Sequence, residues 1–437
     1  MLFKEERGVS VRIVAHFARM FGIVPAHAKD AVDGKLIIRT GNRNSNGLGN
    51  INNIYHRFFI SGNSHQVNAD HALIPTMLPD WTLDGVGGIR HTAFKEYFQS
   101  RGLNMAFRTP YLMFLGDAPD ELAAKTAIGV KDWRPEWCVG QLRLDGCQAD
   151  LKLPDMTPAE GAEAGCGTLI VGIANRGGII PDNWVDPIVQ CIENGMDVAS
   201  GLHRKLASNP RIKEAAEKHG RTLTDVRHPT RDFDVASGKK RTGKRLLTIG
   251  TDVSVGKMYT SLAIWRELEK RGLQTTFAAT GQTGIFIAGS GVSVDAVVAD
   301  FISGAVEELA PANDADHWDL VEGQGSLFHA SYAGVTMGLI HGAQPDALVL
   351  CHEANRPHMR GLPEYKVPSL TECIPYYLQA ARLTNPDAQF VGVCVNTSSL
   401  DDKAAEEFLK KASDETGLPA VDPIRNGVGA IVDNMPL

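Results

Sequence analysis

Short runs of consecutive apolar residues alternate with stretches of helical periodicity from Met105 to the end of the chain. Continuous apolar runs of roughly four to eight residues are typical of strands covered on both faces, and intervening helices are typical of parallel sheets. The pattern therefore predicts an α/β protein with a parallel, doubly wound organisation. The expected strands are 111–115, 138–144, 168–173, 197–200, 246–250, 275–279, 319–322, 346–351 and 390–395, and the clearest helices are 121–130, 183–194 and 259–270.

The chain has 437 residues, which exceeds one typical core and indicates more than one domain. We expect a Rossmann-like domain over 105–235 and a P-loop NTPase-like domain over 236–437. The segment 232–245 is polar and basic, and a solvated linker is favoured over a phosphate-contacting patch. Residues 1–104 include an Asn/Gly-rich stretch at 41–56, and we expect a poorly defined, disordered extension there, with the natural start at Met105.

Bulk composition narrows the function classes. The net charge of −7 argues against a nucleic-acid partner, and no apolar run reaches the roughly 18 residues of a membrane span. Seven scattered cysteines without a Cys-x-x-Cys pair indicate reduced thiols, so we expect a cytoplasmic protein that acts on a small-molecule substrate. A homo-oligomer is the usual state of soluble enzymes of this size.

The strongest chemical signal is a strand, a glycine-containing loop, Gly-Lys and a helix, in that order. Such a loop turns backbone N–H groups toward a phosphate, and its lysine and the helix N-terminus add positive charge. Met258 occupies the position where a hydroxyl usually binds Mg²⁺, so metal-assisted NTP cleavage is not expected and no metal site is predicted. The predicted cofactor-binding residues of this loop are Gly250, Thr251, Asp252, Ser254, Val255, Gly256, Lys257, Met258 and Tyr259.

Further polar residues follow predicted strands, at the edge where ligands bind in doubly wound sheets. Glu322 ends the strand 319–322, where a metal ligand, a base and a hydrogen-bond acceptor all stay open as roles. Gln282 follows the strand 275–279, in a segment that also suits a tight turn. Asn396 ends the strand 390–395, where it is expected to contact adenine or to cap the next helix.

The segment 351–360 carries an unusual density of charge directly after a strand. His352 and Glu353 are candidate bases for an amine, and the arginines suit carboxylates. The predicted substrate-binding residues here are Arg356, His358 and Arg360. In the first domain Asn175 and Arg176 form a candidate anion site between a strand and a helix, and His203 follows the next strand.

Several segments together resemble the D-glutamate N-acetyltransferase family, which combines a Rossmann-like and a P-loop domain. The resemblance covers about 106–437 and leaves out residues 1–104. It rests on LGDAPDELAAKTA (115–127), GIANRGG (172–178), DVASGLH (197–203), GTDVSVGKMYT (250–260), ATGQTGIFIAGSGV (279–292), VEGQGSLFHASYAG (321–334), GAQPDALVLCHE (342–353) and AVDPIR (420–425).

The resemblance implies acetyl transfer from acetyl-CoA to the amine of D-glutamate, in D-amino-acid catabolism. In that reading Lys257 and its loop hold CoA phosphates, and Asn396 holds the adenine. Arg356 and Arg360 bind the two carboxylates, and backbone N–H groups near Gly281 or Gly323 stabilise the oxyanion. His352, Glu353 or Glu322 takes the amine proton.

Two other functions stay open at this point. The loop is similar to that of dethiobiotin synthetase, which points to an ATP-dependent, Mg²⁺-using enzyme that activates a carboxylate. A nucleotide-binding regulator without turnover is the non-enzymatic alternative. Met258 argues against the first of these.

Overall fold

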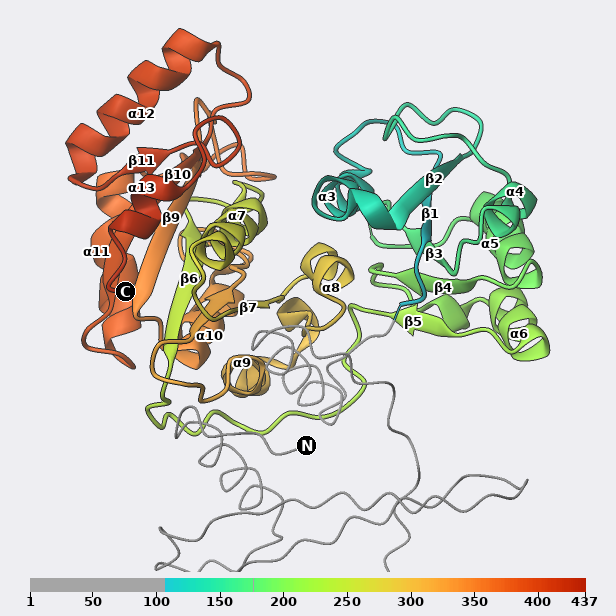
Figure 1. Ribbon diagram of the computed structural model, residues 1–437, viewed down its shortest axis with the longest axis horizontal. Helices are drawn as coiled ribbons and strands as arrows, with labels where there is room; N and C mark the ends of the chain where they lie inside the picture. The colour runs from blue at the N-terminus through green and yellow to red at the C-terminus, as the bar shows by residue number, and fades with distance from the viewer. Residues whose placement is uncertain (1–106, 176) are drawn as a thin grey trace, which may run out of the picture. The chain divides into compact units, whose positions relative to one another are not determined.

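The computed structural model describes residues 107–437 with the exception of Arg176. Two parallel sheets, each with helices on its faces, make up this part of the chain (Figure 1). The expectations for residues 1–104, for Met105 as the natural start, and for Arg176 lie outside the described residues.

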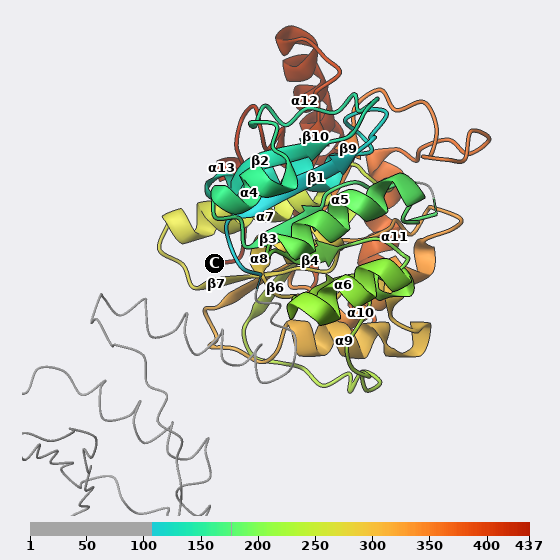
Figure 2. The ribbon, with the colours of Figure 1, turned by 90° about the vertical axis from the view of Figure 1, so that its right-hand side faces the viewer.

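The first sheet has five parallel strands in the order β2-β1-β3-β4-β5, which is a doubly wound order. Helices α4, α5 and α6 lie side by side over one face (Figure 2), and α3 belongs to the other. The elements are β1 (Tyr111–Gly116), α3 (Lys125–Trp133), β2 (Cys138–Arg143), α4 (Pro158–Glu163), β3 (Thr168–Val171), α5 (Asp182–Glu193), β4 (Asp197–Ser200), α6 (Pro210–His219) and β5 (Leu223–Asp225), with short 3₁₀ turns at Pro135–Trp137 and Leu206–Ser208.

The second sheet has six parallel strands in the order β11-β10-β9-β6-β8-β7, with β6 in the interior between β9 and β8. The elements are β6 (Lys244–Gly250), α7 (Lys257–Lys270), β7 (Thr275–Ala278), α8 (Gln282–Ala288), α9 (Ile302–Leu309), β8 (Trp318–Val321), α10 (Ala333–Ala343), β9 (Ala347–Glu353), α11 (Leu370–Arg382), β10 (Gln389–Asn396), α12 (Asp402–Thr416), β11 (Ala420–Val421) and α13 (Gly429–Asp433), with 3₁₀ turns at Val294–Ala296 and Ala299–Phe301.

The predicted two-sheet α/β fold is confirmed, and the nine predicted strands match β1 to β4 and β6 to β10 within two residues at each end. The sequence pattern missed β5 and β11. They have three and two residues, too few to show an apolar run. None of the helices within residues 107–437 has the length and apolar composition that a membrane span requires.

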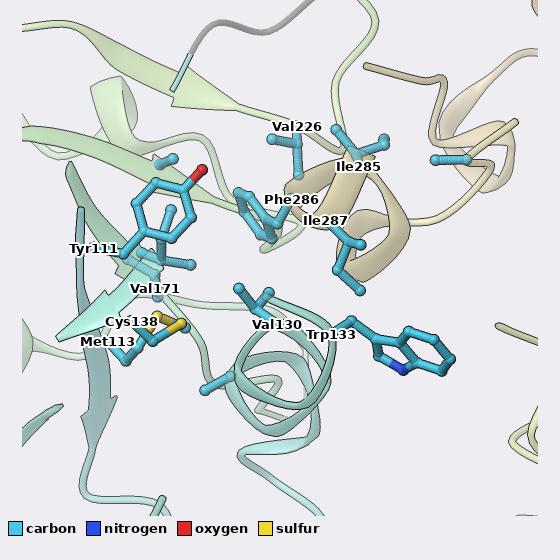
Figure 3. Packing of buried hydrophobic residues seen from close by; sticks show 14 of the residues in the cluster. Tyr111, Met113, Val130, Trp133, Cys138, Val171, Val226, Ile285, Phe286 and Ile287 are labelled. Carbon is cyan, nitrogen blue, oxygen red and sulfur yellow. The ribbon is translucent and has the colours of Figure 1, made fainter. Parts of the chain in front are cut away.

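A single apolar cluster joins the two sheets. Phe286 and Ile287 of α8 lie beside Val130 of α3 (Figure 3), and all three side chains are at most 1% exposed. The helices approach closely because residue 129 is glycine: a Cβ there would lie 2.7 Å from Cγ2 of Thr283. Burial of each large apolar side chain contributes about 1.5–3 kcal/mol, so this contact is a strong link.

Polar contacts complete the joint around α3. The hydroxyl of Tyr259 donates to Oδ2 of Asp132 at 2.7 Å, and Nη2 of Arg266 donates to the carbonyl of Trp133 at 2.6 Å. The guanidinium of Arg266 also lies over the Trp133 ring, 4.3 Å from its centroid. Helix α7, which follows the phosphate loop, is therefore tied directly to the first sheet.

The solvated linker predicted for 232–245 is wrong for two of its arginines. Arg241 donates to carbonyl groups at the C-terminal ends of α9 and α10, among them Ala310 O at 2.7 Å. The side chain of Arg245 is 0% exposed and pairs with Asp346 at 3.5 Å. Helix ends leave carbonyl groups without intrahelical partners, and basic side chains satisfy them there. The segment is irregular but packed.

The packed linker gives a test by substitution. A Cβ on Gly304 of α9 would lie 1.8 Å from the carbonyl oxygen of Asp234, so Gly304→Ala forces the linker or the helix to move. We expect a loss of about 1–3 kcal/mol in the free energy of unfolding, measured by urea denaturation.

Gly334 of α10 is the matched control, because a Cβ there meets nothing within 4 Å. Gly334→Ala should leave stability unchanged or raise it by about 0.5–1 kcal/mol. Equal stability of the two variants would contradict the packing of the linker against α9.

Candidate functional site

The loop between β6 and α7 has the backbone shape of an anion cradle. Ser254 and Gly256 both adopt left-handed conformations, with φ of 55° and 95°. Such residues, placed among right-handed ones, turn successive N–H groups toward one concave side. Helix α7 begins at Lys257 without a side-chain cap, so its first N–H groups stay available.

Lys257 is the cation at the centre of this cradle. Its side chain is 7% exposed, and Nζ donates to the carbonyl of Asp252 at 2.9 Å. Burial lowers the pKa of Lys257 to about 8, and nearby Arg356 acts in the same direction. A buried cation bound to a neutral carbonyl is stabilised by an anionic ligand.

Glu322 follows β8 and lies on the other side of the loop. Its carboxylate is 3% exposed and accepts hydrogen bonds from the backbone N–H groups of Thr280 and Gly281 at 2.9 and 3.1 Å. Burial raises the pKa of Glu322 to about 7, although these two bonds and Lys257 act in the opposite direction. The carboxyl group therefore gains and loses a proton near neutral pH, as a general base must.

Arg356 fixes the shape of the loop. Its Nη1 donates to Oδ2 of Asp252 and to the carbonyl of Val253, both at 2.7 Å, and Nη2 donates to the carbonyl of Ser254 at 3.0 Å. The same group pairs with Glu353. Both terminal nitrogens are thus occupied inside the protein, which favours a bracing role over the predicted contact with a substrate carboxylate.

A cavity of about 1360 Å³ opens over the loop, and residues of both sheets line it. Most of the predicted site residues reach its walls, from the loop and from the ends of β7, β8, β9 and β10. They are Ser254, Val255, Gly256, Lys257, Met258, Tyr259, Gln282, Glu322, Glu353, Arg356, Arg360 and Asn396.

The other predicted residues of the loop, and the two predicted histidines of the segment 351–360, do not line the cavity. Nδ1 of His352 is 3.0 Å from Oγ1 of Thr251, and its ring stacks on Phe408. Burial, together with the nearby positive charge of Arg356, lowers the pKa of His352 to about 4. His358 contacts the carbonyl of Met359 through Nδ1 at 3.0 Å. The remaining residues of this group are Gly250 and Asp252.

Asn175 is also away from the cavity. Its amide donates to the carbonyl of Ile179 at 2.9 Å and accepts from the Ile179 N–H at 3.1 Å, so it closes a turn after β3. The two backbone N–H groups expected near an oxyanion are occupied as well. That of Gly281 donates to Glu322, and that of Gly323 donates to Oγ1 of Thr248 at 3.0 Å.

The contacts of Met258 and Asn396 show which structural role each side chain has. A Cβ on Gly129 would lie 3.2 Å from Cε of Met258, so this methionine packs toward α3 in the joint between the sheets. Asn396 accepts from the Ser398 N–H at 3.1 Å, and it lines the cavity, as does Asp422.

Sequence reasoning missed two cationic residues of the cavity wall, Lys125 and Arg227. Lys125 is the first residue of α3, and Arg227 follows β5. Lys125 lies in the segment 115–127 that carries the family resemblance, which was the available signal. The pattern around Arg227 offered none, because β5 is too short to predict. His203, which follows β4, also lines the cavity.

Family models match both sheets of the chain. One, described as "Domain of unknown function (DUF1611_C) P-loop domain", matches residues 234–432. The other, described as "Domain of unknown function (DUF1611_N) Rossmann-like domain", matches residues 142–229. Together they span most of the described part.

Named relatives and a solved structure are similar over nearly their whole lengths. A D-glutamate N-acetyltransferase of Tritonibacter scottomollicae is 57% identical over 325 residues, which are 74% of this chain and 98% of the relative. One of Pseudoalteromonas sp is 49% identical over 331 residues, 76% of this chain and 100% of the relative. The crystal structure of a DUF1611 family protein from Anabaena variabilis has 32% identity and a TM-score of 0.68, covering 75% of this chain and 99% of that one.

Removal of Arg356 should destabilise the chain through the carboxylate that it leaves behind. The Arg356 and Asp252 side chains are 9% and 0% exposed, so Arg356→Ala strands a buried charge. We expect a loss of about 3–5 kcal/mol in the free energy of unfolding, measured by chemical denaturation. Arg204→Ala, at an exposed position, should cost little. A double variant that also carries Asp252→Ala should recover part of the loss, and no recovery would count against the pair.

His352 should make the protein sensitive to acid. Its pKa is about 4 in the folded chain and about 6.5 in the unfolded chain, so the unfolded state binds more protons between these values. Its contribution is complete above about pH 6.5 and is lost as the pH falls toward 4, by on the order of 1–3 kcal/mol.

The measurement is the free energy of unfolding from pH 7 to pH 4. The free energy of unfolding of His352→Asn should fall less steeply than that of the parent chain. That of His219→Asn, at an exposed position, should follow the parent. Identical slopes for all three would rule out His352 as the acid-sensitive group.

Proposed function

The chain belongs to the DUF1611 family, whose named relatives are D-glutamate N-acetyltransferases, and we propose that it transfers an acetyl group from acetyl-CoA to the amine of D-glutamate. The observation that carries the proposal is the 57% identity over 98% of the Tritonibacter enzyme. In the reaction the amine nitrogen bonds to the acetyl carbon, the carbon–sulfur bond breaks, and a proton lost by nitrogen balances the thiolate that leaves. The products are N-acetyl-D-glutamate and CoA.

The phosphate loop supports acetyl-CoA as the donor. Backbone N–H groups, the α7 N-terminus and the buried Lys257 suit the phosphates of CoA. Asn396 and Asp422, which line the cavity, offer polar groups for the adenine. At about 1360 Å³ the cavity exceeds the roughly 300–1000 Å³ of common ligand sites, which leaves room for a folded pantetheine arm beside an amino acid.

Glu322 is the residue that we assign as general base. Glutamate carries an ammonium group at neutral pH, and nitrogen must lose a proton before or during attack on the thioester. Among the three candidates, His352 does not line the cavity, and Glu353 is paired with Arg356. Glu322 lines the cavity, and its pKa of about 7 suits proton transfer at neutral pH.

Metal-dependent ATP chemistry receives less support. Met258 offers no oxygen for Mg²⁺ and packs toward α3. We place the reaction in the cytoplasm, in D-amino-acid catabolism, and expect a homo-oligomer. The seven cysteines are free thiols, as in proteins of a reducing compartment.

Thiol release from acetyl-CoA tests the function directly. The full chain is assayed with D-glutamate, L-glutamate and no amine, and the product is identified by mass spectrometry. Release only with D-glutamate, with one N-acetylglutamate per thiol, is the expected result. No release, with ATP hydrolysis in its place, would reject the proposal in favour of a nucleotide-using enzyme.

The pH dependence of kcat/KM tests the base. Because Glu322 acts as a carboxylate and its pKa is raised to about 7, kcat/KM should rise with pH up to about 7. Glu322→Gln should lose this limb and lower kcat by about 10²- to 10⁴-fold, with a folded chain by circular dichroism. Glu353→Gln is the matched control and should retain the limb. Loss of the limb in Glu353→Gln alone would move the role to Glu353.

A further inference from the structure

We propose that Lys125 and Arg360 form one subsite for a dicarboxylate, which holds both carboxylates of the amino-acid substrate. The subsite rests on the function proposed above and assigns residues that recognise the substrate. The two cations come from the start of α3 and from the segment after β9, and both line the same cavity.

The surrounding protein fixes Arg360 and the neighbouring Arg227. Arg227 donates through Nε to the carbonyl of Gly201 at 2.8 Å and through Nη2 to Oε1 of Gln282 at 3.0 Å. It also pairs with Asp295, so it braces the cavity wall and is not assigned to the substrate. The backbone N–H of Arg360 donates to Oδ2 of Asp252 at 2.8 Å, which anchors the main chain and leaves the guanidinium in the cavity. Arg227 and Arg360 are therefore each positioned by the surrounding protein and not by contact with one another.

The charges in this part of the cavity do not balance. Arg227 pairs with Asp295. Among the described residues, 107–175 and 177–437, no hydrogen bond or ion pair joins the ammonium of Lys125 or the guanidinium of Arg360 to another side chain. Burial lowers the pKa of Lys125, and the positive charges of Arg360 and Arg227 lower it further. Two uncompensated cations in one cavity are stabilised by a ligand with two negative charges.

The position of Lys125 breaks a local rule of helix stability. It is the first residue of α3, where the helix dipole is positive, and the first turn contains no acidic residue. A cation at that end is unfavourable for the helix by itself. Such a conflict is typical of a binding site, where the ligand supplies the missing negative charge.

The subsite adjoins the proposed base. The N–H of Gly281 donates to Glu322 at 3.1 Å, and the next residue, Gln282, donates to Oγ1 of Thr126, the neighbour of Lys125, at 3.1 Å. Carboxylates held by the cations therefore bring the α-amine of glutamate toward Glu322. Arginine suits this task because its planar group binds a carboxylate with two parallel bonds.

Binding of glutarate to the full chain, by isothermal titration calorimetry, tests the subsite without turnover. Glutarate has the two carboxylates of glutamate and no amine. Lys125→Ala and Arg360→Ala should each weaken glutarate binding by about 10- to 100-fold. Lys131→Ala is the matched control, since Lys131 belongs to the same helix but does not line the cavity.

Steady-state kinetics separate the two anionic substrates. In both variants the KM for D-glutamate should rise by a similar factor, and the KM for acetyl-CoA should change less than about twofold. The preference for D-glutamate over D-glutamine, which lacks the side-chain carboxylate, should fall in at least one variant. Thermal unfolding checks the fold, and Lys125→Gln and Arg360→Gln replace any alanine variant that does not fold.

Unchanged glutarate affinity in folded variants would overturn the subsite, and a rise confined to the KM for acetyl-CoA would assign the cations to CoA phosphates instead. The proposed function fails separately. A chain that binds glutarate through Lys125 and Arg360 but releases no thiol would keep the subsite and lose the acetyltransferase.

Discussion

Asp252 lies fully buried in the phosphate loop, and its carboxylate holds together groups from distant parts of the second sheet. Arg356 donates to Oδ2 at 2.7 Å, and the N–H groups of Val253 and Arg360 donate at 2.7 and 2.8 Å. A buried ion pair contributes little net stability, because the loss of hydration offsets the attraction. Its effect here is on conformation. One carboxylate sets the shape of the loop and the position of Arg360. The phosphate loop and Arg360 therefore cannot move independently.

The parts of the site that could be predicted are those fixed by local order along the chain. Parallel strands end at one edge, so Lys257, Glu322 and Asn396 could be placed together from the strand pattern alone. Lys125 could not, because its place in the cavity depends on how α3 packs on α8. That packing in turn depends on Gly129 and on the buried face of α8, and no periodicity in either helix specifies the partner.

The roles of basic residues depend on their tertiary neighbours in the same way. The pattern before β6 favours a solvated segment, although Arg241 satisfies carbonyl groups of two helices. The contact of Arg356 with the substrate stays a prediction, and in the structure its donors bind the loop. In both cases the sequence identifies a cation, and only the tertiary structure shows which acceptors lie within reach. From the sequence alone, an arginine that binds a ligand cannot be told apart from one that stabilises a loop.

The side chain at position 258 has a consequence for how such a loop can change over time. In a nucleotide-hydrolysing loop this residue supplies one oxygen to a metal. Met258 instead fills space toward Gly129, where the two sheets meet. A serine there would regain the oxygen but leave a void at the contact between the sheets. A return to metal chemistry at this position would therefore cost stability at the joint between the two sheets.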